Sequence, residues 1–136
     1  MGVLVYVDTN TYIDCAEDRK TLFGKSLGPK ALKFFMRAAR CEFDILISHK
    51  VRTELLGNRK DDDMAMLAAL IEKKLRPVDI SPEDVAAAHV LDKKNSADAL
   101  HALTAKRHGA KYLVTSNKDH FLPFSDLVLP VYPDEI

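Results

Sequence analysis

Acidic side chains follow two short apolar runs that lie near opposite ends of the chain. The run Val3–Val7 ends on Asp8, and the run Tyr112–Val114 is followed by Asp119. Short runs rich in β-branched residues are typical of buried strands in a parallel sheet. Because ligands of open α/β sheets bind beyond the carboxyl ends of such strands, we expect both carboxylates to lie at one edge of one sheet.

Two further acids lie on predicted helices, on or beside an apolar face. Glu54 follows Val51 by one helical turn, and Asp98 shares a face with Ala102 at i, i+4. A carboxylate that faces a protein core is costly unless another group compensates it. Both acids are therefore candidates to join Asp8 in one site.

Each of these acids also has an ordinary structural explanation. Asp8 could cap a helix, and Asp98 could be a first-turn acid that interacts favourably with the helix dipole. Glu54 could lie on the surface, and Asp119 could belong to a turn. The convergence of all four on one edge of the sheet favours a shared site.

Four converging carboxylates need protons or cations to stay together. Two unit charges about 4 Å apart repel by roughly 4 kcal/mol at an effective dielectric constant of 20. A cluster made only of oxygen ligands selects Mg²⁺ or Mn²⁺. Such a site suits hydrolysis of a phosphodiester, because one ion activates a bound water and a second can stabilise the leaving oxygen.

The elements between these acids alternate in a way that predicts an α/β fold. The order of strands and helices indicates a three-layer α/β/α sandwich with a central, mostly parallel sheet, as one domain over residues 1–136. The acidic triplet 61–63 is interpreted as a helix start and not as a metal site. Strands are predicted at 3–7, 44–47, 77–80, 112–114 and, at an edge, 127–129. Helices are predicted at 12–16 (capped by Thr9 or Asn10), 30–40, 51–56 (capped by Ser48 and ended by Gly57), 64–71, 82–91 (capped by Ser81) and 97–106 (capped by Ser96).

Charge is balanced over the whole chain. Twenty basic residues offset twenty acidic ones, so no global positive field indicates a nucleic-acid partner. Any such partner must be bound by a local patch, for which a solvated surface is the alternative explanation. The candidates are a helical stripe (Lys30, Lys33, Arg37 and Arg40) and three lysines near the acids (Lys93, Lys94 and Lys118).

The cysteines and the apolar segments indicate the compartment. Cys15 and Cys41 are too few for a disulfide framework or a zinc site, which favours a reducing environment. No secretory leader or membrane span is recognised, so we expect a soluble protein of the cytoplasm, with no membrane partner. His49 and His101 lie nearest to the proposed acids, and His101 could either support the site or simply pack. We expect all five histidines to pack or to lie on the surface.

Four segments in this order resemble a PIN domain. They are Val5–Asn10, Arg52–Leu55, Ser96–Ala102 and Val114–Phe121, which together extend over nearly the whole chain. The resemblance implies a metal-dependent endoribonuclease, and small single-domain members are mostly VapC-type toxins of toxin–antitoxin pairs. It also implies Mg²⁺ or Mn²⁺ as cofactor, RNA as substrate, an antitoxin protein as partner, and a homodimer.

The same resemblance implies the roles of individual residues. The catalytic residues would be Asp8, Glu54, Asp98, Asp119 and Thr115. The metal ligands would be Asp8, Glu54, Asp98, Asn117 and Asp119. The chain departs from the family pattern Thr-x-Asp-x-Asp at Asn117, so Asp119 would take the fourth acidic role and Asn117 would be a weaker or water-mediated ligand.

Other functions are compatible with parts of this pattern. A housekeeping RNA-processing PIN nuclease and a noncatalytic PIN-like module that binds RNA or protein are the alternatives within the family. Receiver-like and haloacid-type phosphotransfer domains also place an aspartate after the first strand. The segment Asp8–Asn10 lacks the Asp-x-Asp pattern of the latter, and no acidic pair precedes Asp8 as receivers require.

Overall fold

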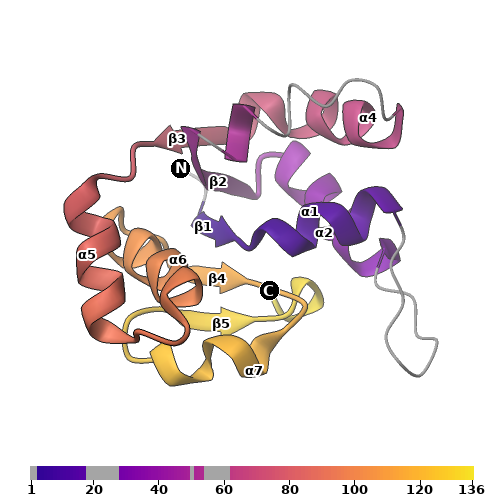
Figure 1. Ribbon diagram of the computed structural model, residues 1–136. Helices are drawn as coiled ribbons and strands as arrows, with labels where there is room; N and C mark the ends of the chain where they lie inside the picture. The colour runs from indigo at the N-terminus through magenta and orange to yellow at the C-terminus, as the bar shows by residue number, and fades with distance from the viewer. Residues whose placement is uncertain (1–2, 18–27, 50, 54–61) are drawn as a thin grey trace.

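The computed structural model describes residues 3–17, 28–49, 51–53 and 62–136 (Figure 1). In this part of the chain, five strands form one sheet in the order β3-β2-β1-β4-β5, and every neighbouring pair is parallel. The predicted parallel sheet is therefore confirmed. The strands are β1 (Val3–Val7), β2 (Phe43–Ser48), β3 (Leu75–Val78), β4 (Tyr112–Val114) and β5 (Leu129–Val131).

Helices cover both faces of this sheet, which confirms the three-layer α/β/α sandwich. Helices α1 (Thr9–Glu17), α2 (Gly28–Ala39) and α4 (Asp62–Ile71) pack on one face. Helices α5 (Pro82–Leu91), α6 (Ser96–Arg107) and α7 (Lys118–Phe121) contribute to the core on the other face. The short 3-10 helices are η1 (Glu72–Lys74), η2 (Leu122–Phe124) and η3 (Pro133–Glu135).

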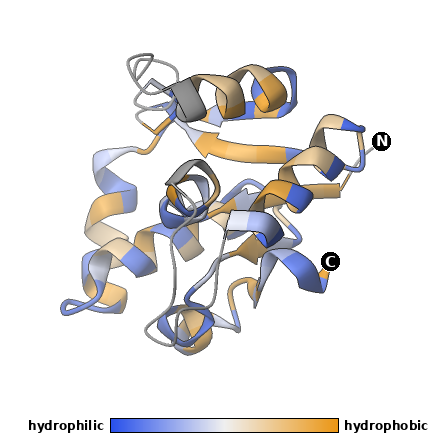
Figure 2. Cartoon of the chain, turned by 90° about the vertical axis from the view of Figure 1, so that its right-hand side faces the viewer, coloured by the Kyte–Doolittle hydropathy of each residue, from blue (hydrophilic) through white to orange (hydrophobic). Residues whose placement is uncertain are grey.

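Alternation along the strands creates two separate cores. In β1, Val5 and Val7 face the α1–α2–α4 layer, while Tyr6 faces the α6 layer. Successive side chains of a strand point to opposite faces, so a sheet covered on both sides must be apolar at every position. Figure 2 shows the result as hydrophobic strands surrounded by helices that are hydrophilic on part of their surface.

Local hydrogen bonds fix where several helices begin and end. The Ser48 hydroxyl accepts from the Val51 amide at 3.2 Å, as the sequence predicts. Helix α5 starts with a reciprocal capping box between Ser81 and Asp84. Helix α6 is closed by Gly109, whose φ of 78° lies in the left-handed region that favours glycine.

Some predicted boundaries are wrong. Strand β3 lies two residues before the predicted 77–80, because Leu75 is buried and pairs with Ile45. Strand β5 lies two residues after the predicted 127–129, because the amides of Leu127 and Val128 donate to the Phe124 carbonyl and close a turn.

Several helix starts also differ from the prediction, among them that of α4, which begins at Asp62 instead of residue 64. Ser96 is inside α6, and Asn95 is its N-cap, without a side-chain bond. Helix α1 begins at Thr9, so neither Thr9 nor Asn10 precedes it as a cap. Helix α2 covers 28–39 instead of the predicted 30–40. None of the helices in the described part of the chain is long and apolar enough to span a bilayer.

Both edge strands of the sheet contain a proline. Pro77 of β3 pairs with Ile47, and Pro130 of β5 pairs with Leu113. Proline has no amide hydrogen to donate, so it is tolerated at a sheet edge far better than at its centre.

Candidate functional site

The carboxyl ends of β1, β4 and β5 lie side by side. The Asp8 amide donates to the Val114 carbonyl at 2.9 Å, and the Thr115 amide donates to the Val131 carbonyl at 2.9 Å. These bonds extend the parallel ladder by one residue on each strand. They place Asp8 and Thr115 together at the edge of the sheet where the sequence predicts the site.

Asp8 is held from two sides. The Thr115 hydroxyl donates to Asp8 Oδ2 at 3.3 Å, and both side chains are buried. The backbone amide of Asn10 donates to the same carboxylate. Asp8 therefore also caps α1, so the structural explanation and the proposed functional role apply to one residue at once.

The environment of Asp8 disfavours its charged form. Only 5% of Asp8 is exposed. Burial raises the pKa of Asp8 above its ordinary value, and the negative charge of Asp98 raises it further. The His101 ring and the bonds from Thr115 and Asn10 oppose this rise without cancelling it. A positive charge at this place would stabilise the carboxylate.

Asp98 and His101 lie one helical turn apart on α6 and face Asp8. The charges of Asp8 and Asp98 both raise the pKa of His101, but burial lowers it more, and the net pKa lies below the usual value of 6.5. The imidazole Nδ1 and the Tyr6 hydroxyl are hydrogen-bonded at 2.5 Å. Since burial raises the pKa of Tyr6, its hydroxyl stays protonated. It can therefore donate to His101.

His101 contributes more to the site than the sequence analysis assigns to it. The ring does pack as predicted, with its centroid 5.5 Å from that of Tyr6 and 6.4 Å from that of Phe121. It also interacts electrostatically with two predicted site residues. The spacing of Asp98 and His101, at i, i+3, is the sequence signal that leaves this role open beside packing.

A second buried acid also lies near the end of β4. Asp14, on α1, is 3% exposed and accepts a hydrogen bond from the Ser116 hydroxyl. This contact ties α1 to the segment that follows Thr115. Neither Asp14 nor Ser116 is predicted to belong to the site, because neither lies at a recognised spacing.

The remaining predicted residues lie differently. Asn117 and Asp119 are exposed at the start of α7, and Asp119 is not among the groups that influence the Asp8 or His101 pKa values. The Asn117 amide donates to the Thr115 hydroxyl at 3.0 Å, which links it to Asp8 through one side chain. Glu54 lies outside the described residues.

A divalent cation fits the chemistry of this edge. Among the described residues, no group of three or more His, Cys, Asp or Glu side chains is placed to hold a metal ion. However, Mg²⁺ keeps several waters and is commonly bound through only one or two carboxylates. Asp8 and Asp98, whose negative charges repel each other, can supply that number, and a cation between them would offset the effect of burial on the Asp8 carboxylate.

Comparisons with known proteins agree with this arrangement. Residues 5–124 match the family model described as PIN domain. A search of curated proteins found no match. Among solved structures, the chain resembles one from the crystal structure of VapBC2 of Rickettsia felis bound to a DNA fragment from its promoter. The TM-score is 0.59 and the identity 15%, over 96% of this chain and 98% of that chain.

Proposed function

Because the chain belongs to the PIN domain family, we propose that it is an endoribonuclease that uses Mg²⁺ or Mn²⁺ to hydrolyse phosphodiester bonds in RNA. The observation that carries the proposal is the Asp8 carboxylate. It is buried at the carboxyl edge of a parallel sheet, beside Asp98, and its pKa is raised. A buried acid at a ligand-binding edge, whose hydrogen bonds do not fully offset its burial, favours a cation there.

The roles that we propose for the residues rest on this placement for Asp8 and Asp98, and on the resemblance to PIN domains for the other ligands. Asp8 and Asp98 would hold the metal, with Glu54, Asp119 and the Asn117 carbonyl oxygen as further ligands in the complex with substrate. The metal would supply an activated water at neutral pH and neutralise charge on the phosphate. Thr115 orients the Asp8 carboxylate through its hydroxyl. Tyr6 fixes the His101 ring behind the two acids.

We propose further that the protein is the toxin of a toxin–antitoxin pair, bound by a small antitoxin protein and assembled as a homodimer in the cytoplasm. The VapBC2 structure supports the toxin–antitoxin part of this proposal, because one of its chains shares the fold over nearly the whole length of both proteins. An inhibitor that inserts an arginine into the acidic edge would suit the site, since a guanidinium pairs bidentately with carboxylates.

Cleavage of a labelled single-stranded RNA tests the enzymatic part of the proposal. We expect cleavage in Mn²⁺ or Mg²⁺, none in a chelator, and none with Asp8→Asn at saturating metal. Asp44→Asn is the matched control, because Asp44 is a half-buried acid in the same sheet whose partner is Arg76 at 3.4 Å. Wild-type activity in Asp8→Asn, or equal loss in both variants, contradicts the assigned site.

Growth of the host tests the toxin part. Expression of the chain alone should arrest growth, and Asp98→Ala or coexpression of the partner should relieve the arrest. Harmless expression of a chain that cleaves RNA in vitro would assign it instead to housekeeping RNA processing. Metal-independent RNA binding without cleavage would indicate a noncatalytic module.

A further inference from the structure

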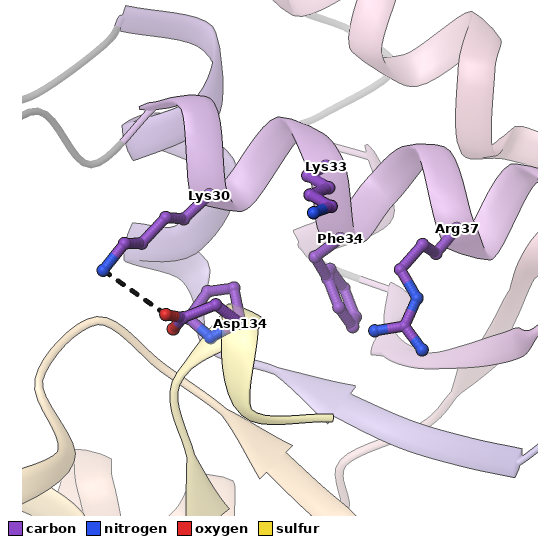
Figure 3. Close-up of a pocket in the computed structure, with 6 residues that line it drawn as sticks. Lys30, Lys33, Phe34, Arg37 and Asp134 are labelled. Atoms are coloured by element: carbon purple, nitrogen blue, oxygen red, sulfur yellow. Dashed lines mark ion pairs between the residues drawn. The ribbon is translucent and has the colours of Figure 1, made fainter.

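A basic groove runs along α2 toward the C-terminal end of the sheet. Its volume is about 310 Å³, at the lower end of the range for ligand sites. Three cations spaced along one side of α2 line it, together with an aromatic ring and the η3 turn (Figure 3). We call this site the α2 groove. Its lining residues are Lys30, Lys33, Phe34, Arg37, Pro133 and Asp134.

The cations of the α2 groove differ in how they are neutralised. Lys30 pairs with Asp134 at 3.3 Å, and Arg37 pairs with Glu42 at 3.1 Å. Lys33 is exposed and has no hydrogen bond or ion pair to any residue that the structure describes. The groove therefore holds one positive charge without a partner among the described residues, next to a lysine in a weak, solvent-exposed pair. An anion can bind Lys33 and compete with Asp134 for Lys30.

Phe34 and Pro133 do not offer a surface for stacking a base, because both are buried. The groove consequently favours the charged part of a ligand over an aromatic ring. A sugar–phosphate backbone has the matching chemistry, since lysine and arginine contacts to phosphates are independent of sequence.

The α2 groove adjoins the rim of the candidate site. Strand β5 ends in register with β4, and η3 follows it directly. Within η3, Asp134 contacts Lys30 of the groove, while its neighbour Glu135 binds Lys118 at 2.8 Å. Lys118 in turn lies between Asn117 and Asp119 at the start of α7. One short turn therefore separates the groove from two of the proposed metal ligands.

We infer that the α2 groove binds the phosphate backbone of the RNA strand beyond the cleavage site, with Lys33 as the principal contact and Asp134 as a competing anion. This inference rests on the proposed function, and it adds the path of the substrate. It also accounts for the predicted basic stripe, of which Lys30, Lys33 and Arg37 line the groove.

Two substitutions should change RNA binding in opposite directions. One phosphate contact releases about 0.7 counterions from a single strand, which corresponds to about fivefold in affinity near 0.1 M salt. Lys33→Ala should weaken binding by about that factor and reduce the slope of log affinity against log salt by about 0.7. Asp134→Asn should strengthen binding. Damage to the fold would not produce a gain.

The measurement is fluorescence anisotropy of a labelled mixed-sequence RNA in chelator, where the proposed enzyme binds without cleaving. Cleavage in Mn²⁺ is then followed for the same variants, and Lys33→Ala should raise KM and leave kcat unchanged. Lys106→Ala is the matched control. Lys106 is an exposed lysine near the end of α6, which packs on the face of the sheet opposite to α2.

The outcomes separate this inference from the proposed function. If the Lys33, Asp134 and Lys106 variants cleave RNA with the same KM, the inference about the α2 groove is wrong and the proposed nuclease activity is unaffected. Groove-dependent binding without any cleavage by the wild type supports the groove and overturns the nuclease. Wild-type protein that neither binds nor cleaves RNA overturns both. Groove-dependent binding of an oligoglutamate peptide, with no effect on RNA, would assign the groove to an acidic protein segment and overturn the inference.

Discussion

Replacing Thr115 by valine should measure how much the carboxyl edge of the sheet depends on one hydroxyl group. Thr115 is completely buried, and its hydroxyl takes part in two hydrogen bonds. Its hydroxyl donates to Asp8 Oδ2 at 3.3 Å and accepts from the Asn117 amide at 3.0 Å. Valine has nearly the same shape, so Thr115→Val removes both bonds while it leaves the packing almost unchanged.

The expected loss of stability follows from the two bonds. A hydrogen bond to a charged group contributes about 1.5–3 kcal/mol, and the length of the Asp8 bond favours the lower value. The bond from the Asn117 amide is neutral and partly exposed, so it contributes about 0.5–1 kcal/mol. The total is roughly 2–2.5 kcal/mol. For a chain of 136 residues, this corresponds to a fall in Tm of about 7–9 °C.

Urea or thermal unfolding of the metal-free protein at pH 7 is the assay. Thr115→Ser is the control, because it keeps the hydroxyl and loses one methyl group, at a cost of about 1 kcal/mol. In an Asp8→Asn background the acceptor is neutral, so Thr115→Val should cost about 1 kcal/mol less than in the wild type. The difference between these two costs of Thr115→Val should become smaller in acid, because the hydroxyl favours the charged form of Asp8.

Two results would refute this reasoning. An equal cost of Thr115→Val with Asp8 and with Asn at position 8 would mean that the hydroxyl does not interact with the carboxylate. A cost no greater than that of Thr115→Ser would mean that neither hydrogen bond contributes measurably to folding.

Three further predictions concern the same part of the molecule. Millimolar Mn²⁺ should raise the Tm of the wild type at pH 7.5, as scanning fluorimetry can measure. The rise in Tm should be smaller at pH 5, because Asp8, with its raised pKa, is then more protonated, and Asp8→Asn should show no rise. Because the pKa of His101 is lowered, the unfolded state binds more protons than the folded state as the pH falls below 6.5, so the free energy of unfolding should decrease there. His101→Gln should flatten that part of the curve of unfolding free energy against pH, measured without metal, whereas an unchanged curve contradicts the burial of His101. Burial, with the charge of Asp14, raises the pKa of the Cys15 thiol to about 11, so iodoacetamide at pH 8 should modify exposed Cys41 first. Peptide mass spectrometry measures which cysteine is labelled, and preferential labelling of Cys15 would contradict the structure.

Most of the architecture could be predicted from local patterns. Buried strands covered on both faces are apolar at each position, so β1 and β2 stand out as continuous runs. Helix α5 is recognisable because Ser81, Pro82 and Asp84 form a strong start signal. Strands β3 and β5 were misplaced by two residues because each contains a proline, and short edge strands have little pattern of their own.

The site was harder to predict than the fold. Asp8 and Thr115 could be placed together because both follow strands that pair in a parallel sheet. The side chain of His101 could not be assigned in the same way, since its role depends on Tyr6, 95 residues earlier in the chain. The exposed position of Asn117 and Asp119 depends on how α7 turns away after β4, which no spacing in the sequence specifies. The ligand set and the catalytic roles stay predictions.

The prolines of the two edge strands have a consequence for the behaviour of the protein in a crowded solution. An exposed edge strand with a full row of free amides and carbonyls can recruit a strand from another molecule and start an aggregate. Pro77 and Pro130 interrupt that row on β3 and β5, and both strands are short, with 4 and 3 residues. The sheet can therefore present apolar, strand-forming sequences in its centre while its margins resist intermolecular strand addition. Pro77→Val should increase the tendency of the purified protein to aggregate on concentration.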